Sequence, residues 1–459
     1  MSSKALIEDA PFTSFHRKLT IYSSGGPFLD GYILSIIGIA LSQLSPQLHL
    51  SALWSGLIGA SALAGIFLGG LVFGYVSDLL GRQALYTIDL IIFIVGSILQ
   101  FFVSNAVELF ILRLIVGIAI GADYPITTAL LGEFLPRKQR GPLVGSLFCT
   151  WYVGATAAYI VGYLLLGTGP NAWRWMLASS VVPAVIIVLL RFGTPESPRW
   201  LLSKGRIDEA RQVIHQVFGP EYDIESLGEV QEKTRFTKLF EPGYLGRVLF
   251  VGAFYMLQII PLFAMYTFGP EILAAFHLDK GNASILGSAL ISLFFLIGVI
   301  PAMLLVNKLG RRKLIIFSFL FMTIGLFIDA LFPNGSVGVV LAGFLIYALF
   351  SGGPNVLDLV YPSELFPTDV RASAVGVTTA ISRIGAFVGT FAVPFALTNM
   401  GIGTTMYIAT GLTFLGLIIC VAFAPETKNT TLGESSVVKN SRTGAIASRH
   451  SLQQTDILD

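Results

Sequence analysis

Residues 74–82, Gly-Tyr-Val-Ser-Asp-Leu-Leu-Gly-Arg, and residues 307–312, Asn-Lys-Leu-Gly-Arg-Arg, carry one short motif twice in a chain of 459 residues. Each copy follows an apolar run, and the shared glycines, Gly81 and Gly310, lie 229 positions apart. Glycine adopts backbone conformations that other residues avoid, so it suits a tight reversal between two neighbouring helices. The repeated motif therefore predicts that the same turn occurs once in each half of the chain.

Two further motif pairs recur at nearly the same distance. Glu133-Phe-Leu-Pro returns as Glu364-Leu-Phe-Pro after 231 positions, and Pro195-Glu returns as Pro425-Glu after 230. Three pairs at one offset indicate an internal duplication. Because six predicted spans separate the copies, both halves have the same topology and are parallel repeats, related by an axis along the membrane normal.

The composition excludes a water-soluble fold. Apolar residues make up 54% of the chain and charged residues 12%, whereas a soluble domain carries about 25% charge. The charges lie in short clusters between apolar runs that are long enough to cross ~30 Å of hydrocarbon as helices. We therefore predict an all-α membrane protein with twelve transmembrane helices, at residues 19–44, 52–76, 83–103, 107–132, 141–167, 173–192, 245–276, 283–306, 312–332, 337–361, 371–398 and 401–424.

The polar segments divide this chain into four parts. We expect a six-helix bundle at 1–192, a cytoplasmic linker at 193–244, a second six-helix bundle at 245–426, and a flexible cytoplasmic tail at 427–459. Within the linker, residues 207–218 have apolar side chains at helical spacing with charges on the other face, so they predict an amphipathic helix.

The placement of basic residues predicts the orientation. With both termini in the cytoplasm, 25 of the 29 Lys and Arg residues lie inside, as positive-inside topology requires. The opening residues contain no apolar core of a signal peptide. We therefore expect a multi-pass protein of the cell (inner or plasma) membrane, in contact with the lipid bilayer. The net charge of +2 reflects this topology, and nucleic acid is not an expected partner. The four exceptions are Arg113, Arg174, Lys280 and Arg383.

The sequence shows no pattern typical of an enzyme. It has no Walker loop, nucleophile elbow or dinucleotide fingerprint in a usable context, and its five histidines lack metal-ligand spacing. Cys149 and Cys420 fall inside predicted spans and are expected to stay reduced. We therefore predict no enzymatic activity, no cofactor and no metal site.

The repeated charges are candidates for a conformational latch at the inner ends of the helices. Arg–carboxylate pairs can hold helix ends together in one state and separate in another. The alternative is that each arginine only enforces topology and stays solvated. The candidates are Asp78, Arg82, Glu133, Arg140, Glu196, Arg311, Arg312, Glu364, Arg371 and Glu426.

Together these motifs resemble the signatures of the major facilitator superfamily, and residues 195–199 with 425–427 resemble its sugar-porter branch. The resemblance extends over residues 15–428. It implies alternating access, in which two six-helix bundles rock around a central site.

Charges inside the membrane should mark that site. Asp30, Asp123 and Arg383 lie ten or twelve residues from the nearest inner charge, hence ~15–18 Å deep at ~1.5 Å per residue. None has a charged counterpart in the other repeat. A charge at mid-bilayer costs on the order of 2.5–3.5 kcal/mol, so such residues usually serve function. Asp89 and Asp329 lie nearer to span ends and are given no role.

Asp30 and Asp123 are the predicted proton-coupling residues, because a carboxylate in a poorly hydrated cavity can bind and release a proton near neutral pH. Arg113, on the same helix as Asp123, could favour the charged form of either aspartate. The alternative is a static ion pair between the first and fourth spans. The setting of Asp30 resembles the first-span aspartate of proton-coupled sugar porters, and Arg113 matches their fourth-span arginine. Residues 113–125 are more similar to proton-coupled phosphate and organic-acid carriers.

The resemblance to sugar porters weakens where a sugar would bind. Gln258 follows a leucine instead of a second glutamine, and Phe263 and Phe148 stand where that branch has hydroxyl-binding amides. Arg383 either captures an anionic group of the substrate or pairs with Asp358. The predicted substrate-binding residues are Trp151, Gln258, Phe263, Tyr266, Asn355 and Arg383.

Residues 361–368 and 382–385 resemble the metabolite–proton symporters that carry organic ions. We therefore predict a monomeric, proton-coupled symporter of a small polar metabolite, with an organic acid as the first choice. A sugar or cyclitol is second and inorganic phosphate third, and a nutrient sensor that binds its solute without transport stays open.

Overall fold

The computed structural model describes residues 6–227, 236–241, 243–278, 281–366 and 368–428. Every regular element in these ranges is a helix. The first half contains α1 (Ser14–Ser23), α2 (Gly25–Gln47), α3 (Ala52–Leu80), α4 (Arg82–Phe101), α5 (Ala106–Phe134), α6 (Arg137–Leu165), α7 (Ala172–Ala178) and α8 (Val181–Arg191). The second half contains α11 (Tyr244–Ala275), α12 (Ala283–Leu309), α13 (Arg311–Leu331), α14 (Val337–Leu365) and α15 (Thr368–Phe423). Between them lie α9 (Pro198–Ser203) and α10 (Ile207–Phe218). Short 3-10 helices occur at Ile7–Asp9, Leu166–Thr168, Ile224–Leu227 and Phe236–Phe240.

Ten helical segments of the described chain are long and apolar enough to cross a membrane. The last of them lies in α15, which is interrupted at Gly401 by a backbone φ of 75° and therefore makes two spans. The 29-residue helix α5 is not among the ten, yet it packs against α3 and α4 like its neighbours. Counting α15 twice and adding α5 gives a number consistent with the twelve predicted spans. The predicted fold class, an all-α membrane protein built as two parallel repeats, is confirmed.

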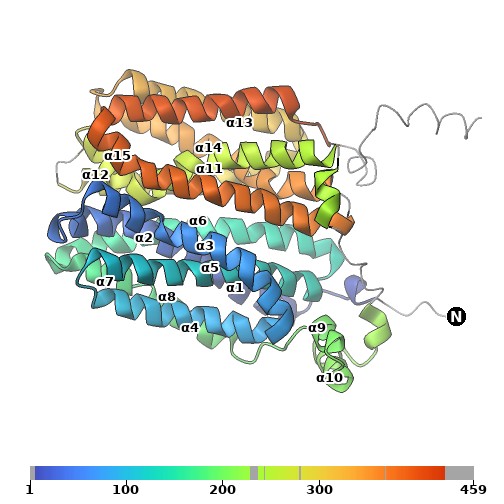
Figure 1. Cartoon of the computed structure of the whole chain (residues 1–459). Coiled ribbons are helices and arrows are strands. Elements are labelled where there is room, and N and C mark those ends of the chain that lie inside the picture. The colour runs from blue at the N-terminus through green and yellow to red at the C-terminus, as the bar shows by residue number, and fades with distance from the viewer. Residues whose placement is uncertain (1–5, 228–235, 242, 279–280, 367, 429–459) are drawn as a thin grey trace, which may run out of the picture.

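The two halves form two bundles with the same internal packing (Figure 1). In the first bundle α2 packs against α6, and α3 against α5. In the second, α11 packs against α15, and α12 against α14. Contacts of α3 with α15, α6 with α12, and α2 with α11 join the bundles. We call the end of the molecule that carries α9 and α10, at the right of Figure 1, the linker face, and the opposite end the far face.

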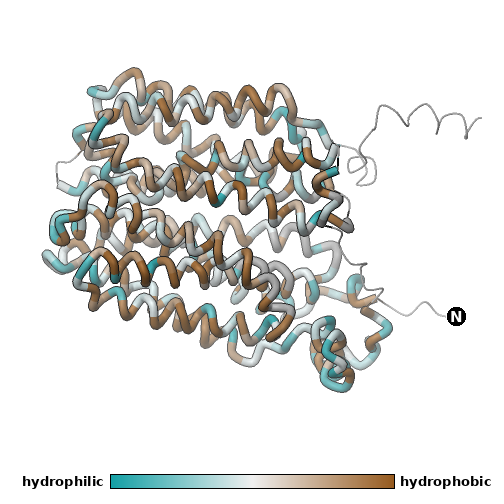
Figure 2. Tube along the Cα trace, viewed as in Figure 1, coloured by the Kyte–Doolittle hydropathy of each residue, from teal (hydrophilic) through white to brown (hydrophobic). Residues whose placement is uncertain are grey.

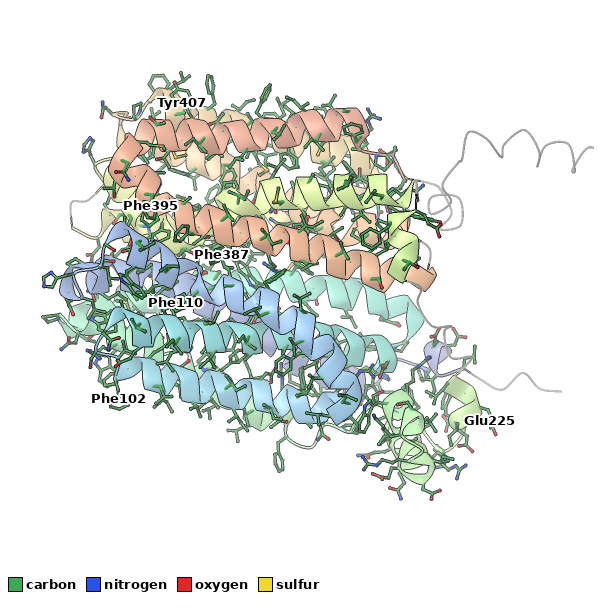
Figure 3. The ribbon with its side chains drawn as sticks, viewed as in Figure 1. Phe102, Phe110, Glu225, Phe387, Phe395 and Tyr407 are labelled. Carbon is green, nitrogen blue, oxygen red and sulfur yellow. The ribbon has the colours of Figure 1, made fainter. Side chains whose placement is uncertain are left out.

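Along the spans most residues are hydrophobic, and hydrophilic residues gather at the helix ends and in the linker (Figure 2). Outward side chains such as Leu189 and Leu304 are 70% and 67% exposed. Phe102 lies at the far face and Glu225 beyond the linker face, at opposite ends of the molecule (Figure 3). Such a surface suits a lipid environment, where helices satisfy their own backbone hydrogen bonds and present apolar side chains.

The linker helix α10 covers the residues predicted for it and docks on the first bundle. Its apolar face is buried, and the ring of Phe218 lies 6.3 Å from Phe134 of α5 and 5.6 Å from His16 of α1.

In the half of the molecule near the far face, the two bundles touch backbone to backbone. A Cβ added to Gly38 of α2 would lie 2.8 Å from the carbonyl oxygen of Tyr266 of α11. The same carbonyl accepts a hydrogen bond of 2.9 Å from the hydroxyl of Tyr159. Gly59 of α3 packs equally closely on the ring of Phe268. The bundles are therefore closed against each other on the far side.

Candidate proton and substrate site

Three carboxylates and one guanidinium are buried together in the first bundle. Asp30 of α2, Asp89 of α4, Asp123 of α5 and Arg191 at the end of α8 are each at most 5% exposed. Arg191 Nη2 donates a hydrogen bond of 3.3 Å to Asp123 Oδ1, and its Nη1 lies 3.9 Å from Asp89 Oδ1. Arg191 is therefore the cation that holds α4, α5 and α8 together at this level.

The guanidinium of Arg191 is fixed from two further sides. It lies 3.4 Å from the ring centroid of Tyr86 and donates hydrogen bonds to the backbone carbonyls of Tyr86 and Tyr22, at 3.1 and 3.4 Å. A planar cation on an aromatic face gains a cation–π attraction, which is strongest away from water. These contacts leave Arg191 little freedom to turn away from the carboxylates.

Asp30 is buried without a hydrogen-bond partner for either carboxylate oxygen within the described residues. It interacts electrostatically with Asp123 and Arg191 of its own bundle and with Arg383 of the other. One helical turn before Asp30, a Cβ on Gly26 would lie 1.9 Å from Asp123 Oδ2, so the carboxylate of Asp123 rests against the backbone of α2. Asp30 and Asp123, the two predicted proton-coupling residues, thus lie near each other, with Arg383 in electrostatic range.

The structure does not place Arg113 with these carboxylates. Its side chain is 1% exposed, and its Nε and Nη2 have no hydrogen-bond partner among the described residues. Ten residues separate it from Asp123 along α5, or ~15 Å. This corrects the expectation that Arg113 favours the charged form of Asp30 or Asp123, because Arg191 and not Arg113 lies beside Asp123. From the sequence, Arg191 looks like one more basic residue at the inner end of a span. The signal that could have revealed its role is the apolar Val421 at the equivalent position of the second repeat.

A polar pair is buried in the second bundle, between α11 and α14. Gln258 Nε2 of α11 donates a hydrogen bond of 2.7 Å to Asn355 Oδ1 of α14, and Asn355 Nδ2 donates one of 2.8 Å to the carbonyl of Ser351. Gln258 is fully buried, and its Oε1 has no partner in the described part of the chain. One amide acceptor therefore stays available for a hydroxyl or amine donor.

Aromatic rings from both bundles meet at α11, the helix that carries Gln258. Trp151 of α6 contacts Phe263 and Tyr266 of α11, with ring centroids 5.9 and 5.1 Å apart in edge-on geometry. Tyr152 of α6 lies 6.4 Å from Tyr266. All four are buried. The predicted residues Trp151, Phe263 and Tyr266 thus meet across the interface of the bundles.

Arg383 of α15 lies between carboxylates of the two bundles. Its Cζ is 5.6 Å from the ring centroid of Phe263, and it interacts electrostatically with Asp358 of α14 and with Asp30. Among the described residues no ion pair within 4.0 Å joins it to either acid, and its Nε has no hydrogen-bond partner. The alternative of a closed Arg383–Asp358 pair is therefore not realised.

The charged network at the linker face of the first bundle joins α4, α5 and the segment after α8. Arg82 Nη1 lies 2.6 Å from Glu133 Oε1, and the hydroxyl of Ser197 donates to Glu133. Glu196 accepts hydrogen bonds from the backbone N–H groups of Arg82 and Gln83, at 3.2 and 3.0 Å.

The second bundle repeats this network in register. Arg311 Nη2 lies 2.6 Å from Glu364 Oε1, and the hydroxyl of Thr427 donates to Glu364 at 2.5 Å. Glu426 accepts hydrogen bonds from the backbone N–H groups of Arg311 and Arg312, at 2.9 and 3.3 Å. The latch candidates thus pair inside each bundle.

Four latch candidates behave differently or have side chains outside the described residues. Arg371 donates a hydrogen bond to the carbonyl of Phe366, and the described residues give it no carboxylate partner. The guanidinium of Arg312 donates to the carbonyl of Val421. The side chains of Asp78 and Arg140 lie outside the described residues.

Comparisons with known proteins agree with this arrangement. A family model described as "Sugar (and other) transporter" matches residues 13–438. The putative metabolite transport protein YaaU of Escherichia coli (strain K12) is 47% identical over 94% of this chain and 96% of its own length. The arabinose-proton symporter of Bacillus subtilis (strain 168) is 29% identical, over 89% and 92%. A partially occluded inward-open structure of the xylose transporter XylE from E. coli has a TM-score of 0.78 at 25% identity, and the match covers 91% of this chain and 100% of that chain.

Proposed function

Because this chain belongs to the sugar (and other) transporter family of the major facilitator superfamily, we propose that it is a proton-coupled symporter of a small organic acid that works by alternating access. The main support for an acidic substrate is the guanidinium of Arg383, which lies beside Phe263 at the bundle interface. Its Nε has no hydrogen-bond partner among the described residues. A guanidinium fork matches the geometry of a carboxylate and binds it in a bidentate manner.

A polar pair between α11 and α14 and the rings at the bundle interface favour an acid that also carries hydroxyl groups. The buried Gln258–Asn355 pair leaves an amide acceptor for a hydroxyl donor. The rings of Trp151 and Phe263 offer an apolar wall. A hydroxylated carboxylic acid of sugar size is therefore the substrate class that matches the chemistry of these groups.

Proton coupling rests on Asp30. A buried carboxylate without hydrogen bonds is costly to leave charged, and a bound proton removes that cost. Asp30 and Arg383 attract each other across the bundle interface while Asp30 is ionised. A substrate carboxylate on Arg383 weakens that attraction and so favours protonation of Asp30. Proton and acid would then bind cooperatively, as a symporter requires.

We further propose that the chain is a monomer in the cell's inner (plasma) membrane, with both termini and the linker face in the cytoplasm. The distribution of basic residues supports this orientation. In that orientation, the closed far side belongs to a state in which substrate exchanges with the cytoplasm.

A neutral sugar or cyclitol is the second candidate, favoured by the Gln258–Asn355 pair and by relatives whose names include a glucose transporter and a myo-inositol transporter. Inorganic phosphate would use Arg383 but not the aromatic wall, and it is third. A sensor would bind its solute without moving it.

Uptake by purified protein in lipid vesicles tests the proposal. We expect saturable accumulation of hydroxylated carboxylic acids under an inward proton gradient, and its loss when a protonophore collapses the gradient. Preferential accumulation of neutral sugars, or of phosphate, would contradict the organic acid as substrate. Saturable binding without flux would identify a sensor and contradict transport itself.

A further inference from the structure

We propose that Asp89 and Asp123, clamped by Arg191, share one proton and form a second proton-binding site through which the transported proton passes from Asp30 toward the linker face. This inference rests on the proposed symport and adds two residues, Asp89 and Arg191, to its proton path.

The geometry of the two carboxyl groups carries the inference. Asp89 and Asp123 come from neighbouring helices and are at most 2% exposed, and both carboxyl groups lie against the guanidinium of Arg191. In each of them Oδ2 is buried and has no hydrogen-bond partner among the described residues. Two carboxylates held by one guanidinium in a dry site repel each other, and the single charge of Arg191 balances only one of them, which favours a proton shared by the pair. A proton between them turns the repulsion into a hydrogen bond, and the pair then carries a single negative charge that Arg191 balances.

Among the described residues, the charged and titratable groups around the pair offer no other way to balance its charge. Asp30 approaches from α2, Tyr86 and Asp89 lie on α4, and Arg191 closes α8, while Tyr22 of α1 faces Arg191. Three carboxylates thus share one guanidinium in this bundle, and Arg383 reaches the group only through Asp30. When Arg383 holds a substrate carboxylate, neutrality requires two protons, one on Asp30 and one on the Asp89–Asp123 pair.

The order along α2 gives the direction of transfer. Asp123 touches α2 at Gly26, one turn or ~5.4 Å closer to the linker face than Asp30. In the transfer, the O–H bond of protonated Asp30 breaks and a new O–H bond forms on the Asp89–Asp123 pair. The proton already held by the pair leaves to water on the linker side. Asp30 becomes a carboxylate, the charge of the pair is unchanged, and no other reactant is consumed.

Counting released protons tests the shared site without any substrate. Purified full-length protein in detergent is titrated from acidic to alkaline pH with a pH-indicator dye, for the wild type, Asp89→Asn, Asp123→Asn and the double variant. Each single variant should release one proton fewer than the wild type, because the remaining carboxylate pairs with Arg191 and stays ionised. The double variant should also release one fewer. A loss of two in the double variant, or no loss in the single variants, would overturn the shared proton.

Transport measurements test the path. In vesicles, Asp89→Asn and Arg191→Gln should lose gradient-driven accumulation, whereas Arg191→Lys should retain part of it. The matched control is Asp329→Asn, which changes a buried carboxyl of α13 outside the cluster and should behave as the wild type. Wild-type accumulation in both Asp89→Asn and Arg191→Gln would overturn the path. If the wild type itself shows no proton-driven uptake, the proposed symport fails, and the proton count still decides whether the shared site exists.

Discussion

In the proposed mechanism, Arg383 selects substrates by their charge. We expect Arg383→Ala to raise the KM of an anionic substrate about 10- to 100-fold, the loss of a charge-assisted hydrogen bond worth roughly 1.5–3 kcal/mol. Arg383→Lys should give an intermediate KM, because an ammonium group cannot form the bidentate fork. Initial uptake rates over a range of substrate concentrations measure this. A KM unchanged in Arg383→Ala would remove the guanidinium from the binding site.

In the proposed mechanism, proton coupling depends on Asp30. In Asp30→Asn the side chain has nearly the same shape but cannot carry a transferable proton. We expect gradient-driven uptake to be abolished while counterflow exchange of substrate partly remains, since exchange needs binding and rocking but no net proton movement. Parallel uptake and counterflow assays separate the two. Full concentrative uptake by Asp30→Asn would exclude Asp30 from the mechanism.

The individual residues of the site were predictable to different degrees. Depth along a helix follows from counting, so Asp30, Asp123 and Arg383 could be placed near the centre from the sequence. The interaction partners of these residues could not be predicted, because they depend on how the helices are rotated against one another. Arg113 and Arg191 are both arginines at span positions, and only the packing of α8 against α4 selects Arg191 as the partner of Asp123.

At the scale of elements, the turns between α3 and α4 and between α12 and α13 require glycine. Gly81 and Gly310 have φ angles of 98° and 89°, and a Cβ on either would lie 2.5 Å from a carboxylate oxygen of Glu196 or Glu426. Gly310→Ala should therefore lower stability by at least about 1–2 kcal/mol and reduce the Tm. Gly411→Ala, where an added Cβ meets nothing within 4 Å, is the matched control and should not lower it. Equal Tm values for both variants would show that the turn tolerates a side chain.

The networks at the helix ends should stabilise each bundle from within. Glu364→Gln removes the carboxylate shared by Arg311 and Thr427, and we expect a stability loss of about 1.5–3 kcal/mol. Thermal unfolding of the purified protein measures it. Unchanged unfolding would favour the alternative that Arg311 only enforces topology and stays solvated.

Which elements exist was largely predictable, because apolar runs and repeated glycine motifs mark the spans and their turns. The division of the sixth span into α7 and α8 could not be predicted from the sequence. Ser179 and Ser180 lie at this break, where their hydroxyls hydrogen-bond to Tyr32 and Ser97 at 2.6 and 2.7 Å. Those partners come from α2 and α4, so the break depends on tertiary contacts rather than on local sequence.

At the scale of the whole molecule, the duplication predicts the architecture. Charged residues that break the repeat mark the candidate site. The linker-face networks obey the repeat, with Arg82 matched by Arg311 and Glu133 by Glu364. The buried charges of the first bundle do not repeat, and they lie on one side of an interface that the second bundle completes with Arg383. The relative placement of the bundles could not be predicted, because the same sequence must form the contacts of more than one state.

Substrate-driven proton movement tests the central claim most directly, that buried charges at the interface of two rocking bundles couple acid uptake to protons. The measurement is the pH of a weakly buffered medium when a hydroxylated carboxylic acid is added to vesicles without an imposed gradient. The account predicts that the medium becomes more alkaline with the wild type and stays constant with Asp30→Asn. Saturable uptake of the acid by the wild type with no change in external pH would contradict it.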